Sequence, residues 1–223
     1  AVSSAHHEIL NGLSKIQRGQ NNENSGLSKE SEVIKNAIIV VNSEIYNTAQ
    51  TDEACHGMGT TIIVVLFHDN KCTIGHVGDS RVYRKRGESF AQITKDHSLI
   101  QELIDRGLYS PEEAVKHAPK NLVTRAMGID SQVEVDIGEE NVQQGDIYML
   151  CSDGLNEMVG DEEIHLTLSK YSANLVQAAD ELVRLANSKG GKDNISIILV
   201  KVLEEFSSSN GSIIKKLKSR FFQ

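Results

Sequence analysis

The chain has 223 residues, of which 39% are hydrophobic and 24% are charged, a composition typical of a globular protein. It excludes disorder, a collagen helix or a coiled coil as a description of the whole chain. The formal net charge of −8 argues against a general nucleic-acid binder, because the phosphate backbone would be repelled.

Three cysteines, Cys55, Cys72 and Cys151, are an odd number and include no Cys-x-x-Cys pair, which favours a reducing compartment over a disulfide framework. The longest apolar runs have the length of strands and fall short of the ~18 residues that a membrane span needs. The first residues also lack the pattern of a secretion signal. We therefore expect a cytoplasmic protein. The chain starts at Ala1 within a helical pattern, so we also expect a fragment or a processed piece.

Two helices are predicted first. Apolar residues recur at helical spacing in residues 1–17, and those between Ser31 and Gln50 form one face of a long amphipathic helix. Residues 18–26 form a polar segment between the two. After Gly59 the pattern changes to strands, expected at 60–67, 72–77, 81–85 and 90–93. Tight turn signals separate these strands, so we expect an antiparallel meander.

Short helices return in residues 96–130, where Ser110-Pro111-Glu112-Glu113 is a strong start signal. Further strands are expected at 133–137 and 146–151, followed by helices at 161–170 and 173–189. The last strand, 195–202, is almost wholly apolar, which predicts a central strand covered on both faces. This order of elements predicts a layered α+β domain with helices on both sheet faces.

The end of the chain differs in character. Residues 207–211 read as a flexible linker. The residues beyond it alternate five apolar side chains with four cations. Such a tail could touch an anionic membrane, but so few cations favour a solvated or self-docked end.

Three aspartates stand at the boundaries of predicted strands. Asp79 lies in Gly78-Asp79-Ser80-Arg81, Asp153 in Ser152-Asp153-Gly154, and Asp193 in Lys192-Asp193-Asn194. Taken singly, each segment is an ordinary turn sequence, because Asp closes turns on its own backbone. Converging carboxylates repel one another unless they share a cation, and Mg²⁺ and Mn²⁺ prefer such oxygen ligands. The spacing alone leaves turns and a metal cluster as equal alternatives.

Six segments together resemble the successive motifs of the metal-dependent type 2C protein phosphatases. The bacterial serine/threonine members, which often oppose eukaryotic-like kinases, match best. Order and spacing agree from about residue 1 to residue 203. The segments are residues 57–61, 75–83, 96–99, 122–128, 150–155 and 193–196.

The resemblance implies an α-β-β-α sandwich: two stacked antiparallel β-sheets flanked by helix pairs. Residues 1–203 would form this domain, with residues 96–130 as a flap beside the site, and residues 204–223 would be a linker and a basic amphipathic tail. Two Mg²⁺ or Mn²⁺ ions, or three, would bind at one edge. By resemblance, Asp153 and Asp193 hold the first metal, and Asp79 joins Asp153 at a third, weaker site. A metal-bound hydroxide would attack phosphoserine or phosphothreonine on proteins.

The chain departs from the family pattern at its start. Family members begin with two strands that carry the bridging aspartate, a carbonyl ligand of the second metal and a phosphate-binding arginine. These N-terminal strands are missing here, so we predict no catalytic residue beyond the metal ligands and expect these 223 residues alone to have little or no activity. The alternatives are a non-catalytic phosphatase-like binding or regulatory module, or a structural Ca²⁺ site. The implied partners are phosphorylated protein substrates and a eukaryotic-like Ser/Thr kinase with its targets.

Four further residues have competing interpretations. His97 could be catalytic, but a structural hydrogen bond is favoured. Cys151 follows a strand, so buried packing is favoured over a nucleophilic role. Arg81 and Arg125 could touch phosphate, but salt bridges to the acidic rim are the better interpretation.

Overall fold

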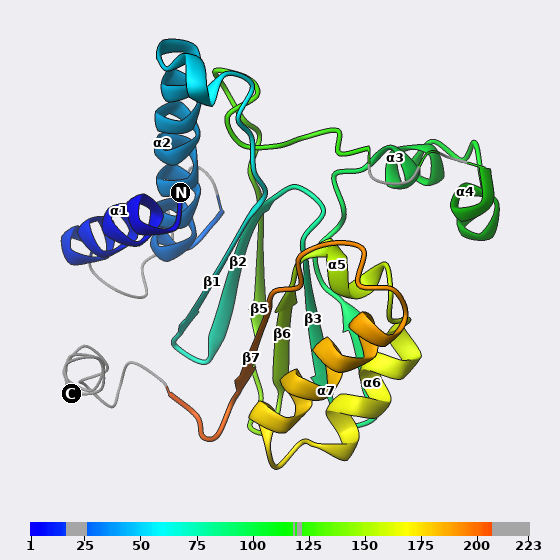
Figure 1. Ribbon diagram of the computed structural model, residues 1–223. Coiled ribbons are helices and arrows are strands. Elements are labelled where there is room, and N and C mark those ends of the chain that lie inside the picture. Colours follow the sequence, from blue (N-terminus) through cyan, green and yellow to red (C-terminus); the bar gives the residue numbers. More distant parts are fainter. Residues whose placement is uncertain (17–25, 118, 120–121, 207–223) are drawn as a thin grey trace.

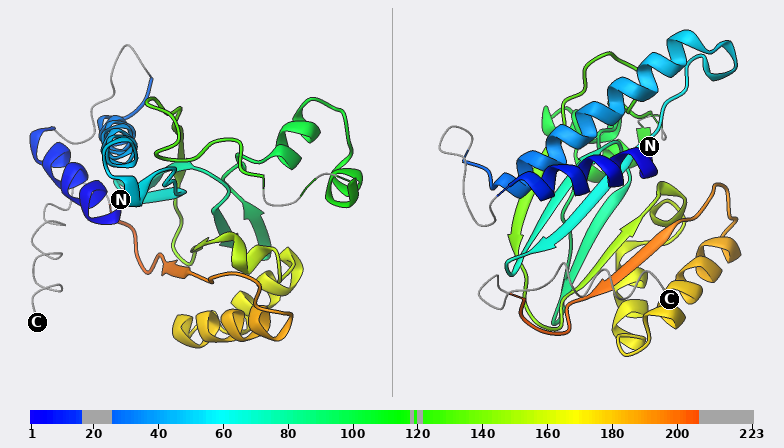
Figure 2. Two further views of the ribbon diagram at one scale, coloured as in Figure 1. Left: turned by 45° about the horizontal axis from the view of Figure 1, so that its top comes forward. Right: turned by 90° about the vertical axis from the view of Figure 1, so that its left-hand side faces the viewer.

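The computed structural model describes residues 1–16, 26–117, 119 and 122–206. They form four layers, in which two antiparallel sheets lie between two groups of helices (Figure 1). Figure 2 shows the two helix groups on opposite sides of the strands. The predicted α-β-β-α sandwich is therefore confirmed.

The sheets contain three and four strands. The first has the order β1 (Ile62–His68), β2 (Lys71–Val77), β5 (Asp136–Asn141). The second has the order β4 (Ser89–Gln92), β3 (Arg81–Arg86), β6 (Ile147–Cys151), β7 (Ile197–Lys201). All strand pairs in both sheets are antiparallel.

The helices divide into three groups. The first covers the β1-β2-β5 sheet and consists of α1 (Val2–Lys15) and α2 (Lys29–Thr51), with a 3₁₀ turn at Glu53–Cys55 after it. The second packs on the other sheet and consists of α5 (Asp153–Asn156), α6 (Asp161–Lys170) and α7 (Leu175–Ser188). The third, α3 (Leu99–Asp105) and α4 (Pro111–His117), projects away from the sheets in Figure 1.

Helix α2 begins at a capping serine and lies close to the sheet, where a glycine of β2 faces it. The Ser28 hydroxyl accepts the Ser31 amide hydrogen at 3.1 Å and caps the first turn. Ile34 and Ile38 are fully buried on the inner face. A Cβ on Gly75 of β2 would lie 2.6 Å from the Ile34 side chain, so only glycine permits this approach.

The space between the sheets is filled by apolar side chains from both. Cys72 and Ile74 of the first sheet pack with Val82 and Tyr148 of the second. The Tyr148 ring meets Phe67 edge-on at 5.2 Å. Because strands of both sheets are covered on two faces, their residues are buried without a strict alternation.

The predicted meander is wrong at one step. β1 pairs with β2 and β3 pairs with β4, but β2 and β3 belong to different sheets. The chain changes sheet at Gly78, whose φ is +112° and whose position leaves no room for a Cβ beside Thr61. This conformation is one that glycine adopts readily and other residues avoid.

The prediction that the last strand is central is also wrong. In the described part of the chain β7 is an edge strand, and β3 and β6 are the two inner strands of its sheet. Ile198 is 59% exposed, whereas Ile197 and Leu199 pack towards α6 and α7. An apolar run therefore predicted the strand correctly but not its place in the sheet.

The remaining predictions concern the start of α4, the start of β5, the polar segment 18–26 and the tail. The start signal at residue 110 is a capping box, with Ser110 Oγ accepting from the Glu113 amide and Glu113 from the Ser110 amide. The strand expected at 133–137 begins later, at Asp136. Most of the polar segment 18–26 and the tail beyond residue 206 lie outside the described residues. No helix among the described residues is long and apolar enough to cross a membrane.

Candidate metal centre

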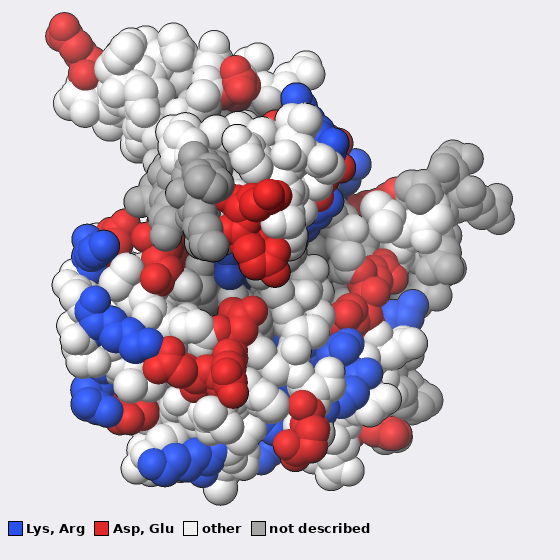
Figure 3. Space-filling model, turned by 90° about the vertical axis from the view of Figure 1, so that its right-hand side faces the viewer, with Lys and Arg blue, Asp and Glu red and all other residues white. Residues whose placement is uncertain are grey.

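A cavity of about 320 Å³ lies between the start of β3, α3 and α5. Its walls come from the β2–β3 connection, the start of the α3 segment, the α5 region and the loop before β7. Figure 3 shows acidic side chains grouped over the middle of one face of the molecule. The charged residues that line the cavity are Asp79, Arg81, Asp96, Asp153, Glu157 and Lys192.

Two of the three predicted aspartates reach this cavity. Asp79 follows the Gly78 corner, where the chain leaves the first sheet and enters the second. Asp153 follows β6 and is the first residue of α5, where the sequence predicted only a turn. Its Oδ1 accepts the Gly154 amide hydrogen at 2.9 Å.

The third aspartate lies on the neighbouring stretch of chain. Ser152 binds this stretch twice: its hydroxyl donates to the Asn194 carbonyl at 3.0 Å and accepts from the Ser196 amide at 3.0 Å. Gly154 lies directly against the backbone of residues 193 and 194. Asp193 itself is exposed and its Oδ1 accepts the Asn194 amide hydrogen, while Lys192 lines the cavity. The structure therefore joins the two stretches but directs only Asp79 and Asp153 to the cavity wall.

The electrostatics of Asp79 are dominated by burial and by neighbouring carboxylates. Burial raises the pKa of Asp79, and the negative charge of Asp153 raises it further, with smaller effects from Asp96 and Glu157. Among the described residues no cationic side chain forms an ion pair with Asp79, Asp153 or Asp193. Carboxylates arranged in this way repel each other unless they are protonated or share a cation.

These side chains fit a hard divalent ion. Carboxylate oxygens are the donors that Mg²⁺ and Mn²⁺ prefer, and the ion would remove the repulsion that raises the Asp79 pKa. Two further carboxylates of the same cavity, Asp96 and Glu157, were not predicted. Glu157 follows Asp153 by four residues on a helical turn, and this spacing could have indicated it.

Arg81 is bound to the rim of the cavity, as predicted. Its guanidinium holds both oxygens of Asp96, with Nη2 at 2.7 Å from Oδ2, and donates to the Tyr83 hydroxyl at 2.9 Å. Tyr83 in turn donates to Asp161 at 3.1 Å. This chain of hydrogen bonds fixes the rim against the second helix group.

A second network lies beside the Gly78 corner. The Gly78 amide donates to His97 Nδ1 at 3.0 Å, and the His97 ring stacks on His76 at 4.7 Å. His97 Nε2 faces Asp136 at 3.3 Å, and Arg125 binds the same carboxylate at 2.7 Å. Burial lowers the pKa of His97, and the charge of Arg125 lowers it further, so the ring is neutral at neutral pH.

His76, His97 and Asp136 are grouped closely enough to hold a metal ion. Arg125, however, already supplies the positive charge that Asp136 requires. The favoured interpretations of His97 as a structural side chain and of Arg125 as a salt-bridge partner agree with this geometry.

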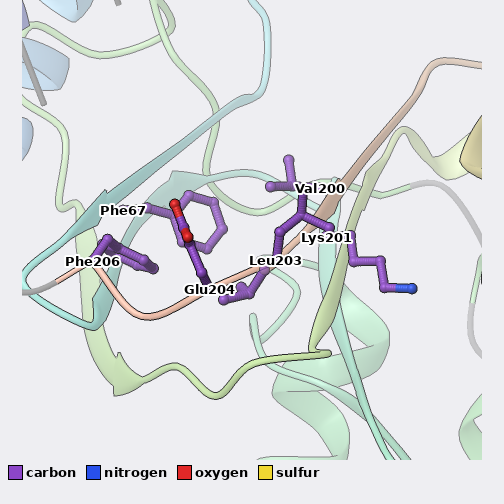
Figure 4. Close-up of a pocket in the computed structure, with 7 residues that line it drawn as sticks. Phe67, Val200, Lys201, Leu203, Glu204 and Phe206 are labelled. Carbon is purple, nitrogen blue, oxygen red and sulfur yellow. The ribbon is translucent and has the colours of Figure 1, made fainter. Parts of the chain in front are cut away.

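Another cavity, of about 290 Å³, is shown in Figure 4. It lies along the end of β7 and is lined mainly by apolar side chains, among them Phe67, Leu203 and Phe206. Phe206 donates its amide hydrogen to Asn70 Oδ1 at 2.5 Å and packs against the core between the sheets. This cavity offers no cluster of catalytic groups among its lining residues.

Comparison with known proteins agrees with the geometry. The sequence model described as "Protein phosphatase 2C" matches residues 2–199. The chain belongs to the protein phosphatase 2C family. The protein phosphatase PhpP of Streptococcus pneumoniae is 40% identical over 166 residues, which cover 74% of this chain and 67% of that protein. The chain therefore spans about two thirds of the length of that relative.

Solved structures of the family have the same fold. The serine/threonine phosphatase PstP/Ppp of Mycobacterium tuberculosis matches with a TM-score of 0.73 and 31% identity, over 91% of this chain and 83% of that one. The catalytic domain of PstP in complex with two manganese ions matches with a TM-score of 0.68 and 31% identity, over 91% of this chain and 82% of that one. The prediction of Mg²⁺ or Mn²⁺ as cofactor agrees with the two manganese ions bound to this relative.

Two of the three cysteines of this phosphatase 2C chain, Cys72 and Cys151, are packing residues. Cys151 and Cys72 are buried, and burial raises the pKa of each thiol to about 12. A thiol that stays protonated is a poor nucleophile. The interpretation of Cys151 as a buried side chain is therefore supported by the structure.

Proposed function

We propose that these residues belong to a cytoplasmic, Mg²⁺- or Mn²⁺-dependent phosphatase that removes phosphate from serine and threonine side chains of proteins. The observation that carries the proposal is the pair Asp79 and Asp153, half-buried in one cavity without a cationic partner among the described residues. The free thiols support the cytoplasmic location. Substrates phosphorylated by a eukaryotic-like Ser/Thr kinase fit the names of the relatives.

Asp153, Asp193 and Asp79 would hold the metal ions. When bound, such ions withdraw charge from a phosphoryl group and lower the pKa of water. Other residues of the chain hold these ligands and the rim of the cavity in position. Ser152 holds the Asp193 stretch beside Asp153, and the bond between Arg81 and Asp96 keeps that arginine on the rim.

Lys192 supplies the remaining positive charge of the cavity. In the part of the chain that the structure describes it forms no ion pair, in contrast to Arg81. A phosphate dianion entering the cavity would meet this ammonium group at the wall. Lys192 therefore attracts the substrate, while the rim arginine keeps its carboxylate partner.

The test is hydrolysis of p-nitrophenyl phosphate by the full-length protein in Mn²⁺. Asp153→Asn should reduce the Mn²⁺-dependent rate at least 100-fold, because it removes a metal ligand and leaves the fold intact. Asp180→Asn, an equal change of charge on the exposed face of α7, should keep the rate. Equal rates for the two variants would refute the assignment of Asp153. Complete absence of Mn²⁺-dependent hydrolysis by the wild-type protein would instead favour a non-catalytic binding module.

A further inference from the structure

A second cluster of ligand-type side chains lies at the other end of β2 from Asp79. It contains Glu30 from the first turn of α2, and His68 and Asp69 from the β1–β2 turn. Figure 2 shows the beginning of α2 at the end of the layer where this turn lies. β2 runs from Lys71 to Val77, so its seven residues, about 20 Å of strand, separate the cluster from the Asp79 cavity.

Glu30 is the unusual member of the cluster. Its exposed fraction is 2%, and both of its carboxylate oxygens lack a hydrogen-bond partner in the described part of the chain. Glu139, close to the same turn of helix, shows the ordinary arrangement. It accepts from the Ser28 amide at 3.0 Å and from the Ser31 hydroxyl. A buried carboxylate with no partner is costly, because nothing replaces the water that it has lost.

The other two side chains face Glu30. One ligand atom each of Glu30, His68 and Asp69 lies within 4.8 Å of the other two. The His68 ring is held in place by Thr73, whose hydroxyl lies 2.9 Å from Nε2. Metal-binding histidines ordinarily have such a partner on the second nitrogen, which fixes the orientation of the ring. The partial positive charge at the start of α2 attracts Glu30 but does not satisfy two carboxylate oxygens.

We propose that Glu30, His68 and Asp69 bind one divalent transition-metal ion, which joins the start of α2 to the β1–β2 turn. An imidazole with two carboxylates suits Zn²⁺, which takes three protein ligands and one water in many sites. Mg²⁺ fits less well, because it prefers oxygen ligands throughout and retains its waters. The ion would neutralise the buried charge of Glu30 and would stabilise the fold without taking part in hydrolysis.

The experiment measures Zn²⁺ binding to the metal-stripped full-length protein by calorimetry and thermal unfolding, in excess Mg²⁺ to occupy the Asp79–Asp153 cavity. We expect the wild type to bind one more Zn²⁺ ion than Glu30→Gln or His68→Ala. Zinc at 100 times its dissociation constant should raise the wild-type Tm by about 5 °C or more and should leave these variants unchanged. Glu44→Gln, an exposed position on the same helix, is the matched control and should behave like the wild type.

The stability of Glu30→Gln without metal shows whether this variant is correctly folded. In the presence of a chelator it should be at least as stable as the wild type, because it removes the unpartnered charge. If Glu30→Gln and His68→Ala bind as much Zn²⁺ as Glu44→Gln, the site does not exist. Hydrolysis of p-nitrophenyl phosphate in Mn²⁺ is a separate readout. It should stay unchanged in all three variants, so loss of this site is distinguishable from loss of the phosphatase centre.

Discussion

Gly154 is the point at which packing and the proposed metal centre can be tested together. It lies next to Asp153, and a Cβ at this position would be 2.4 Å from the Asn194 carbonyl oxygen and 3.4 Å from the Asp193 carbonyl carbon. An ordinary C···O contact is about 3.3 Å, so the carbonyl must retreat by about 0.9 Å in Gly154→Ala. That movement separates Asp153 from Asp193 and strains the bond from Ser152 to Asn194.

The change in the free energy of unfolding of Gly154→Ala is the sum of opposing contributions. Overpacking costs about 1–3 kcal/mol, and loss of the Ser152 hydrogen bond costs about 1 kcal/mol. Alanine gains at most about 1 kcal/mol over glycine in a helix, here a helix of four residues. We therefore expect a net destabilisation of about 2 kcal/mol, which lowers Tm by roughly 4–8 °C in a chain of this size. A displacement of about 1 Å at a catalytic centre can cost about 100-fold in rate.

The assays are thermal unfolding and Mn²⁺-dependent hydrolysis of p-nitrophenyl phosphate by the full-length protein. The control is Gly138→Ala in β5, where a Cβ meets no atom within 4 Å. Gly138→Ala should retain both the wild-type rate and the wild-type Tm to within about 2 °C. The reasoning is refuted if Gly154→Ala cannot be distinguished from this control in either assay.

Two further predictions concern acid stability and thiol reactivity. Burial raises the pKa of Glu139, but hydrogen bonds from Ser28 and Ser31 outweigh it and lower the pKa to about 2. The stabilisation is therefore present above the ordinary pKa of about 4.5 and is lost as the pH falls towards 2. Urea unfolding should show that Glu139→Gln loses about 1–2 kcal/mol at pH 7 and declines less between pH 5 and 3 than the wild type; parallel curves would contradict this. An aromatic disulfide reagent at pH 8 should modify one thiol rapidly, Cys55, because Cys72 and Cys151 are buried; rapid reaction of all three would show that the core opens.

The helices and strands were predictable because each follows a local rule. The spacing of Ile34, Ile38 and Val41 indicates the buried face of α2 directly, and all three are fully buried. The Asp69-Asn70 turn is another such case: both residues have positive φ, as this dipeptide tolerates. Local periodicity was therefore sufficient to find nearly every element.

The pairing of strands was not predictable from the same rules. Alternation shows which face a side chain occupies but not which strand lies beside it, so Gly78 read as a hairpin turn although it transfers the chain between sheets. The ring pair of His76 and His97 and the bond between Arg125 and Asp136 join residues distant in sequence. Such contacts depend on the tertiary fold, and no spacing in the chain indicates them.

The surroundings of Asp79 and Asp153 favour a metal-binding role over a role as turn residues. Asp153 Oδ1 accepts the amide hydrogen of Gly154, and an asparagine at this position could accept the same bond without a charge. The negative charge of Asp153 raises the pKa of Asp79, which shows that the two carboxylates repel each other. If this segment were only a structural turn, asparagine at position 153 would therefore make the protein more stable. The neighbouring Asp96 has an arginine partner, whereas these two carboxylates have no cationic partner in the described ranges. Their mutual repulsion costs stability in the free protein, and we propose that a divalent cation bound between them removes this cost.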